Sequence, residues 1–365
     1  MISPPDRKLG TRELFALITI TLGIKFTDMT ATLLYKETAQ AAWMVPLLSG
    51  LVMSVPLVCI LILVKHYKDK NIMDITYKVT GKFFGFLIGM TLFLISYSAT
   101  IVDSRSYVDI INTMYFPATS STHLFFVLIG SSYFLANRGL LAMGRTAWIT
   151  FPYIKVSLFF IVVLLWSELY FGYLFPIAGF GLKEVAFRGA SYASITSDLL
   201  FFSILFPFFR DYKTFKNATL FGLAVSIFEL MVFFVVFIAY FDYPSIEFIA
   251  YPFHEISRMV TFGRYVSHIE ALFFAFWSVA SLIRFAVYLY ISTAFFAYTA
   301  KIKEFEPLIL PFAVLTIMIG LLPENVVQNV LLLRSNIILM VTSILLFIIP
   351  VTLLIVAKLR GEFKK

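Results

Sequence analysis

The chain has 365 residues, of which 60% are hydrophobic and 14% are charged. Soluble globular proteins are nearer half apolar and a quarter charged, so this composition excludes an ordinary soluble domain and predicts a protein of the lipid bilayer. The formal net charge of +8 could suggest a nucleic-acid partner, but the basic residues lie mostly in short loops between apolar runs, so none is expected.

Apolar runs long enough to cross a bilayer recur along the whole sequence. A hydrocarbon core of about 30 Å needs roughly 20 helical residues. By this measure the chain is predicted to be an all-α integral membrane protein with ten transmembrane helices, at 12–35, 40–64, 83–113, 121–137, 146–168, 190–212, 217–241, 269–299, 306–323 and 335–357. No soluble domain interrupts them, so residues 1–365 are expected to form a single membrane domain.

The distribution of lysine and arginine orients these spans. With the N-terminus placed in the cytoplasm, every cytoplasmic segment carries at least two of these residues and no outer loop carries more than two. Both termini are therefore expected to be cytoplasmic. One long outer loop, 242–268, mixes apolar and charged residues and is predicted to form a short extracytoplasmic helix at the membrane interface.

Charged residues also occur inside the predicted spans, where an uncompensated charge costs at least about 2.5 kcal/mol. Bases and acids are equal in number, so we expect mutual compensation: Lys25, Arg105, Lys155 and Arg284 against Asp28, Asp103, Asp198 and Glu229. They could be structural ion pairs, or they could line a polar cavity for a solute, an ion or a proton. The cavity is favoured for the set as a whole, because small residues can pack helices without charges. Asp103 and Arg105 should point to different faces of their helix and not pair with each other.

Two spans carry signs of an interruption. In the first, a polar or glycine residue occupies almost every second position from Thr19 to Thr30, which would spread polar groups over all faces of a continuous helix. This pattern predicts unwinding at residues 22–24. The sixth span has a counterpart, a hydroxyl-rich start that ends at Asp198 and is followed by an apolar run to Pro207. Interrupted helices in corresponding positions indicate an inverted-repeat transporter, with five-helix halves at 12–168 and 190–357.

Several short motifs accompany this pattern. They are Trp43 seven residues before Gly50, Asp103 with Arg105, Pro176 with Gly179 and Gly181, Pro207 with the basic cluster up to Lys216, Glu270 seven residues before Trp277, and the run Pro323, Glu324 and Asn325. With these motifs the chain resembles, over nearly its whole length, the B subunit of spore germinant receptors. These subunits form the endospore germination permease family, within the amino acid–polyamine–organocation superfamily.

The resemblance implies a five-plus-five inverted repeat with broken helices 1 and 6, located in the spore inner membrane. It also implies recognition of a small nutrient, typically an amino acid, together with an A subunit that forms an ion pathway and a C subunit that is a lipoprotein. The sequence departs from the family pattern at Lys25, where a second glycine and a later proline are usual, at His268, which replaces an arginine, and at Phe201, which replaces an acid. These departures predict an altered pocket.

Together these features predict a ligand pocket between spans 1, 3, 6 and 8. The expected ligand-binding residues are Thr21, Leu22, Gly23, Ile24, Lys25, Phe26, Asp103, Arg105, Asp198, Phe201, Phe202, Trp277 and Arg284. Backbone groups at the first break would bind the carboxylate of an amino acid, and the two arginines would meet an anionic group or form gating pairs. Trp277 is interpreted as either a packing residue or a surface on which the ligand stacks.

Lys155, Asp28 and Glu229 are expected to take part in proton or ion coupling. In proton-coupled members of the superfamily a lysine of span 5 occupies the place of a sodium ion, and Lys155 matches that position; the alternative is a structural ion pair with Asp28 or Asp198. Glu229 could equally be a buried neutral acid bonded to a hydroxyl. The four histidines lack metal spacing, and no phosphate loop or nucleophile–base pair is visible, so no metal, cofactor or enzymatic activity is expected.

The resulting expectation is a subunit that senses an amino acid-like germinant on a transporter fold. Ligand binding would stabilise one closure state of the helices, and a partner subunit would respond to that state. The alternatives are an autonomous proton-coupled amino acid permease and a scaffold subunit whose buried charges only lock helices together.

Overall fold

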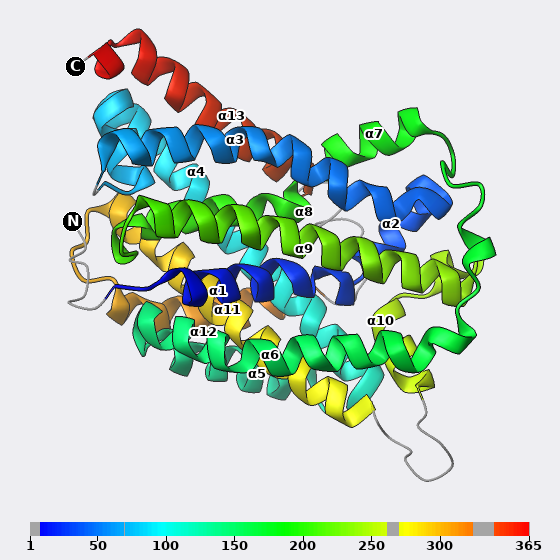
Figure 1. Ribbon diagram of the computed structural model, residues 1–365. Helices are drawn as coiled ribbons and strands as arrows, with labels where there is room; N and C mark the ends of the chain where they lie inside the picture. The colour runs from blue at the N-terminus through cyan, green and yellow to red at the C-terminus, as the bar shows by residue number, and fades with distance from the viewer. Residues whose placement is uncertain (1–7, 69, 261–269, 324–338, 365) are drawn as a thin grey trace.

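The computed structural model describes residues 8–68, 70–260, 270–323 and 339–364, which are helical almost throughout (Figure 1). The α-helices are α1 (Thr11–Gly23), α2 (Thr30–Thr38), α3 (Val45–Tyr67), α4 (Ile72–Ile110), α5 (Ser121–Ala136), α6 (Gly139–Leu165), α7 (Leu182–Ser191), α8 (Ser194–Ser197), α9 (Tyr212–Phe241), α10 (Pro252–Met259), α11 (Glu270–Ala300), α12 (Ile309–Gly320) and α13 (Met340–Leu359). Short 3-10 or π segments extend them: η1 (Ile24–Thr27), η2 (Ala39–Met44), η3 (Ile111–Tyr115), η4 (Trp166–Glu168), η5 (Phe171–Leu174), η6 (Asp198–Phe208), η7 (Ser245–Phe248), η8 (Glu306–Leu308) and η10 (Glu362–Lys364).

Seven helical stretches of the described chain are long and apolar enough to cross a membrane. They are Thr30–Tyr67, Ile72–Tyr115, Gly139–Glu168, Leu182–Phe208, Tyr212–Phe241, Glu270–Ala300 and Met340–Leu359, and the apolar helices Ser121–Ala136 and Glu306–Gly320 are shorter. The predicted all-α architecture is confirmed. Helices occupy all ten predicted ranges, apart from residues 269 and 335–338, which lie outside the described residues together with His268, Glu324 and Asn325. The count of ten crossings and the inverted repeat stay predictions.

The long helices lie side by side, and the first and last described residues lie at the same end of the bundle (Figure 1). Central α1 packs against α6, α9 and α11, and α11 packs in turn against α4 and α5. The outer helices expose large apolar side chains such as Phe126, Phe134, Phe159 and Phe228. Lipid accepts such a surface whereas water does not, so these faces fit a bilayer while α1 is enclosed by protein.

The first interruption begins where the sequence pattern suggested but extends further along the chain. The α-helix ends at Gly23, within the predicted residues 22–24, but the backbone tightens there into η1 and does not unwind. The break comes at Asp28, whose backbone is extended with φ −93° and ψ −177°. Its side chain accepts a hydrogen bond from the Thr30 N–H at 2.8 Å, at the first residue of α2.

The alternating polar residues of α1 need no earlier break. The hydroxyls of Thr19 and Thr21 donate to backbone carbonyls one turn back, at 2.8 and 2.6 Å. Since α1 is buried on all sides from Ala16 to Gly23, its polar groups there are satisfied within the helix or by its neighbours and need not gather on one face.

The second interruption lies where it was predicted. Helix α7 ends at Ser191, a turn leads into the single-turn α8, and the chain continues as η6, a 3-10 helix of 11 residues that begins at Asp198. Runs of 3-10 helix longer than three or four residues are uncommon and often mark a hinge or a strained sequence. Residues 190–212 therefore do not form one regular α-helix.

Helix α4 bends at Gly81, which has φ +83° and ψ −179°. Only glycine adopts this backbone conformation without strain. Nothing lies within 4 Å of the place where a Cβ would be added, so the backbone alone opposes a larger residue.

We predict that Gly81→Ala lowers the free energy of unfolding by about 1–2 kcal/mol, through backbone strain alone. The matched control is Gly130→Ala in α5, where the surroundings are equally open and the backbone is helical, so alanine should be neutral or slightly stabilising. Thermal unfolding of the purified proteins in detergent measures both effects. Equal melting temperatures for the two variants would contradict the claim that Gly81 is needed for its backbone conformation.

Candidate functional site

Three helices that are distant in the sequence meet at the side chain of Arg284 in α11. Its guanidinium is fully buried and donates to the carboxylate of Asp103 in α4 and, at 3.1 Å, to the Thr21 carbonyl in α1. It also lies over the rings of Tyr107 and Tyr288, 5.6 and 5.1 Å from their centroids. The Thr21 carbonyl, which was expected to face a ligand, is therefore bound by a side chain of the protein.

A second buried ion pair joins the interrupted parts of spans 1 and 6. The Nζ of Lys25 lies 2.5 Å from Oδ2 of Asp198, and it donates to the carbonyls of Ile195 and Ser194 at 2.8 and 3.4 Å. The Tyr288 hydroxyl donates to the same Asp198 oxygen. Because the Tyr288 ring also lies next to the Arg284 guanidinium, this tyrosine connects the Lys25–Asp198 pair to the Arg284–Asp103 pair. We call Lys25, Asp103, Asp198 and Arg284 the central charge cluster.

A third pair contacts a different face of α1. Lys155 of α6 binds Glu229 of α9, with both carboxylate oxygens 2.6 Å from Nζ. The alternative pairing of Lys155 with Asp198 is wrong, because Asp198 binds Lys25. Glu229, which was also interpreted as a neutral acid bonded to a hydroxyl, is bonded to the Lys155 ammonium. A Cβ added to Gly23 would overlap the Glu229 carboxylate and lie 3.4 Å from Lys155 Nζ, so glycine is what allows α1 to approach this pair.

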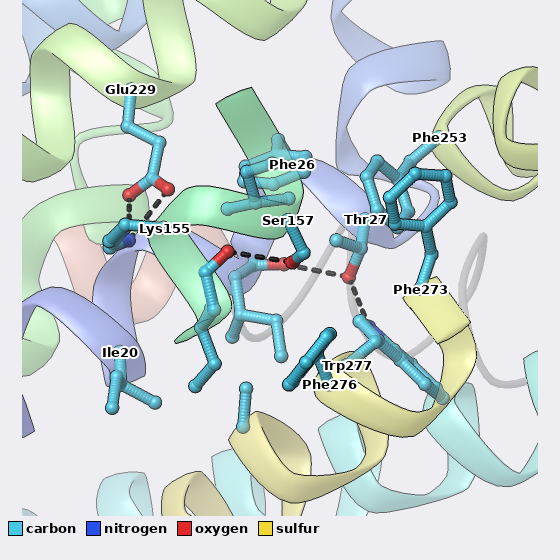
Figure 2. Close-up of a pocket in the computed structure, with 14 residues that line it drawn as sticks. Ile20, Phe26, Thr27, Lys155, Ser157, Glu229, Phe253, Phe273, Phe276 and Trp277 are labelled. Atoms are coloured by element: carbon cyan, nitrogen blue, oxygen red, sulfur yellow. Dashed lines mark hydrogen bonds and ion pairs between the residues drawn. The ribbon is translucent and has the colours of Figure 1, made fainter. Parts of the chain in front are cut away.

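A narrow cavity of about 20 Å³, enough for roughly one water molecule, lies beside Lys155 and Glu229 (Figure 2). Residues of α1, η1, α6, α9, α10 and α11 line it: Ile20, Ile24, Phe26, Thr27, Ile154, Lys155, Ser157, Leu158, Glu229, Phe253, Phe273, Phe276, Trp277 and Ala280. Among these lining residues only Lys155 and Glu229 are charged, and most of the others are apolar. We call this space the α1–α11 cavity.

The two ends of the cavity differ in chemistry. Figure 2 shows Lys155 and Glu229 at one end and an aromatic group that includes Phe273 and Trp277 at the other. Trp277 donates from Nε1 to the Thr27 hydroxyl at 2.9 Å and stacks on Tyr107 with ring centroids 5.2 Å apart. Trp277 therefore remains compatible with both interpretations, a packing residue and a surface for ligand stacking, since it packs within the bundle and also forms a cavity wall.

Helix α10, within the loop predicted to lie at the interface, covers the aromatic end. Phe253 lines the cavity and packs edge-on against Phe26, with centroids 5.1 Å apart. The adjacent His254 is fully buried, with its Nδ1 2.8 Å from the Tyr115 hydroxyl and its ring edge-on to Trp277. Burial lowers the pKa of His254 to about 3, so the imidazole is neutral near neutral pH. This helix is packed into the bundle and does not simply lie on its surface.

The structure brings only part of the expected site together. Of the predicted residues, Ile24, Phe26, Trp277, Lys155 and Glu229 line the cavity. The cavity lining does not include Thr21, Leu22, Gly23, Lys25, Asp28, Asp103, Arg105, Asp198, Phe201, Phe202 or Arg284. The space expected between spans 1, 3, 6 and 8 is instead occupied by the central charge cluster, because opposite charges from four helical segments meet there and neutralise one another.

The remaining predicted residues of spans 3 and 6 have partners within the protein. Arg105 pairs with Asp109 one turn along α4 at 2.9 Å, so the prediction that it does not pair with Asp103 is confirmed. Phe201 and Phe202 are buried in η6, and Phe201 packs edge-on against Phe295. Within the described residues, no group of three or more histidine, cysteine or acidic side chains could hold a metal ion.

Sequence reasoning missed most of the aromatic wall. Phe273, Phe276, Trp277 and Ala280 follow the spacing of one helix face, and this periodicity in span 8 could have identified them together. Phe253 gave no such signal, because it lies in a loop whose fold against the bundle cannot be derived from periodicity.

We predict that Gly23→Leu abolishes the response to ligand, because the added side chain would displace the Lys155–Glu229 pair from α1. Gly130→Leu is the matched control, since open space surrounds that position in α5. The measurement is ligand binding or ligand-triggered germination with variants that insert normally. An unchanged response in Gly23→Leu would show that the cavity beside this pair is not the ligand site.

No curated protein matches the sequence. A model of the spore permease family, described as spore germination protein, matches residues 8–329, which include all three ion pairs and every residue that lines the cavity. The chain therefore belongs to the spore permease family of spore germination proteins.

Proposed function

We propose that the protein is a nutrient-sensing subunit of a spore germinant receptor and that it binds an amino acid-like germinant in the α1–α11 cavity. Membership of the family supports a germination-related membrane permease. The observation that carries the finer proposal is the cavity itself, which combines one partly buried pair of opposite charges with mostly apolar walls.

The chemistry of the cavity suits a zwitterion. A free amino acid carries a carboxylate and an ammonium next to a single side chain. Lys155 and Glu229 supply one charge of each sign, held 2.6 Å apart. An entering amino acid would exchange both partners at once, its carboxylate binding Lys155 and its ammonium binding Glu229, so that no charge is left unpaired away from water. Because a cavity of about 20 Å³ is too small for an amino acid, the surrounding helices would have to separate on binding, and the aromatic end would then receive an apolar side chain.

Signalling would proceed by a shift of populations between closure states. Ligand between α1, α6 and α11 would stabilise one arrangement of these helices, and partner subunits, an A subunit with an ion pathway and a C lipoprotein, would respond to it. The proposal includes ten crossings in two five-helix halves, 12–168 and 190–357, cytoplasmic termini and the spore inner membrane. The first and last described residues lie at one end of the bundle, as an even number of crossings requires (Figure 1).

The second candidate is an autonomous proton-coupled amino acid permease. The observation that favours it is the contact of the Lys155–Glu229 pair with α1 at Gly23, where the interruption begins. A titratable pair that touches both the cavity and a discontinuous helix is suited to link proton transfer to helix movement.

Binding and uptake by the purified chain in liposomes separate the candidates. A panel of labelled amino acids, including apolar, small and charged members, is tested with and without a proton gradient. The receptor proposal predicts saturable binding of an apolar amino acid without accumulation. Accumulation driven by the gradient would establish the permease instead. Absence of binding for the whole panel would contradict both and favour a scaffold role.

Variants of Lys155 test its role in coupling. We predict that Lys155→Ala alters the pH dependence of ligand binding, because it leaves Glu229 without its positive partner. Lys155→Arg keeps the positive charge beside Glu229, so it should keep ligand binding. Binding is measured from pH 5 to 9. Profiles identical to the wild type in both variants would leave Lys155 a structural role only.

A further inference from the structure

The ammonium group of Lys25 is held as a bound cation would be held. It contacts three oxygens: the Asp198 carboxylate at 2.5 Å, the Ile195 carbonyl at 2.8 Å and the Ser194 carbonyl at 3.4 Å. A lysine ammonium has three donors and no acceptor, so this set of oxygens satisfies it fully. Lys25 is 6% exposed and Asp198 is equally buried, so water contributes little to the site.

The oxygens come from the interrupted part of span 6. Ser194 and Ile195 belong to the single-turn α8, and Asp198 is the first residue of the irregular η6. Carbonyls at a helix break, together with a carboxylate, form the kind of oxygen shell that coordinates monovalent cations inside membrane proteins. Lys25 reaches this shell from η1, on the other interrupted span.

The charge balance of the central charge cluster also requires a cation beside Asp198. Lys25 and Arg284 are joined with Asp103 and Asp198 through the ion pairs and through Tyr288, which gives two charges of each sign. Removal of Lys25 alone would leave one uncompensated negative charge in a medium where such a charge is costly. An external cation of suitable size would restore the balance.

We propose that the Asp198 carboxylate and the Ser194 and Ile195 carbonyls form a monovalent-cation site that the protein fills with its own Lys25 ammonium. The lysine is an internal counter-ion, which ties η1 to α8 and η6 without a dissolved cation. The inference concerns the central charge cluster and does not depend on the ligand proposed for the α1–α11 cavity. The Lys155–Glu229 pair differs, because its hydrogen bonds go to carboxylate oxygens alone.

Thermal unfolding of the full-length protein in detergent tests this site. Lys25→Met is compared with the wild type in the chloride salts of ammonium, methylammonium, sodium and potassium at constant ionic strength. Tetramethylammonium, which has no N–H donor and is too bulky for the shell, is the reference. The wild type should have one Tm in all five salts. Lys25→Met should have a lower Tm in the reference salt and a saturable rise with a smaller cation, and the order of the cations shows whether the site prefers hydrogen-bond donors or alkali ions.

Two controls make the result specific. Lys78→Met breaks the pair of Lys78 with Glu362, which are 2.7 Å apart but with the lysine side chain 42% exposed, so its Tm should show no preference among cations. Lys25→Met combined with Asp198→Asn removes both charges while an amide oxygen remains for the Tyr288 hydroxyl, so the cation effect should disappear.

The proposal is overturned if Lys25→Met shows no cation effect, or if the wild type is stabilised by the same cations to the same extent. Should Lys25→Met alone fail to be recovered, the double variant must still be recovered, because it leaves no unpaired charge. Loss of both variants would overturn the proposal as well.

Discussion

The guanidinium of Arg284 has no exposed surface, so atoms of the protein must balance its charge. Asp103 supplies the opposite charge, the Thr21 carbonyl accepts a further hydrogen bond, and the rings of Tyr107 and Tyr288 enclose it. These contacts hold α11 against α4 and α1 in one arrangement. Removing one partner of such a buried pair costs about 3–5 kcal/mol, more than most single apolar contacts supply. The position of α1, and with it the cavity, depends on this interaction.

The ion pairs next to α1 are not equivalent. Each cation of the central charge cluster binds a carboxylate and at least one backbone carbonyl, and Tyr288 links its two pairs. Lys155 and Glu229 hold each other with fewer outside contacts, and the Lys155 side chain is 23% exposed. A pair of this kind can exchange partners at lower cost than the cluster can. The cluster therefore acts as the rigid frame, and the Lys155–Glu229 pair is the part of the site suited to respond to a ligand.

Much of this architecture could be predicted from sequence, because bilayer thickness imposes helix length and the cost of buried charge identifies the residues that need partners. The pairing itself could not be predicted. An ion pair of Lys155 with Asp28 or Asp198 was one of two alternatives, whereas its partner is Glu229, since the partner of a charge depends on how helices pack and not on its depth in a span. The α-helix ends at Gly23, within the expected residues 22–24, but the backbone becomes extended only at Asp28, because threonine hydroxyls satisfied the polar pattern within the helix. Phe253 entered the cavity from a loop with no periodic pattern.

The central claim, that the α1–α11 cavity is the ligand site, is tested most directly through the fluorescence of Trp277. A protein in which Trp43, Trp148 and Trp166 are replaced by phenylalanine reports from this wall alone. The account predicts that the amino acid bound in liposomes changes the emission of Trp277 saturably, with the same concentration dependence as binding. Normal binding with no change in Trp277 emission would place the ligand elsewhere and contradict the account.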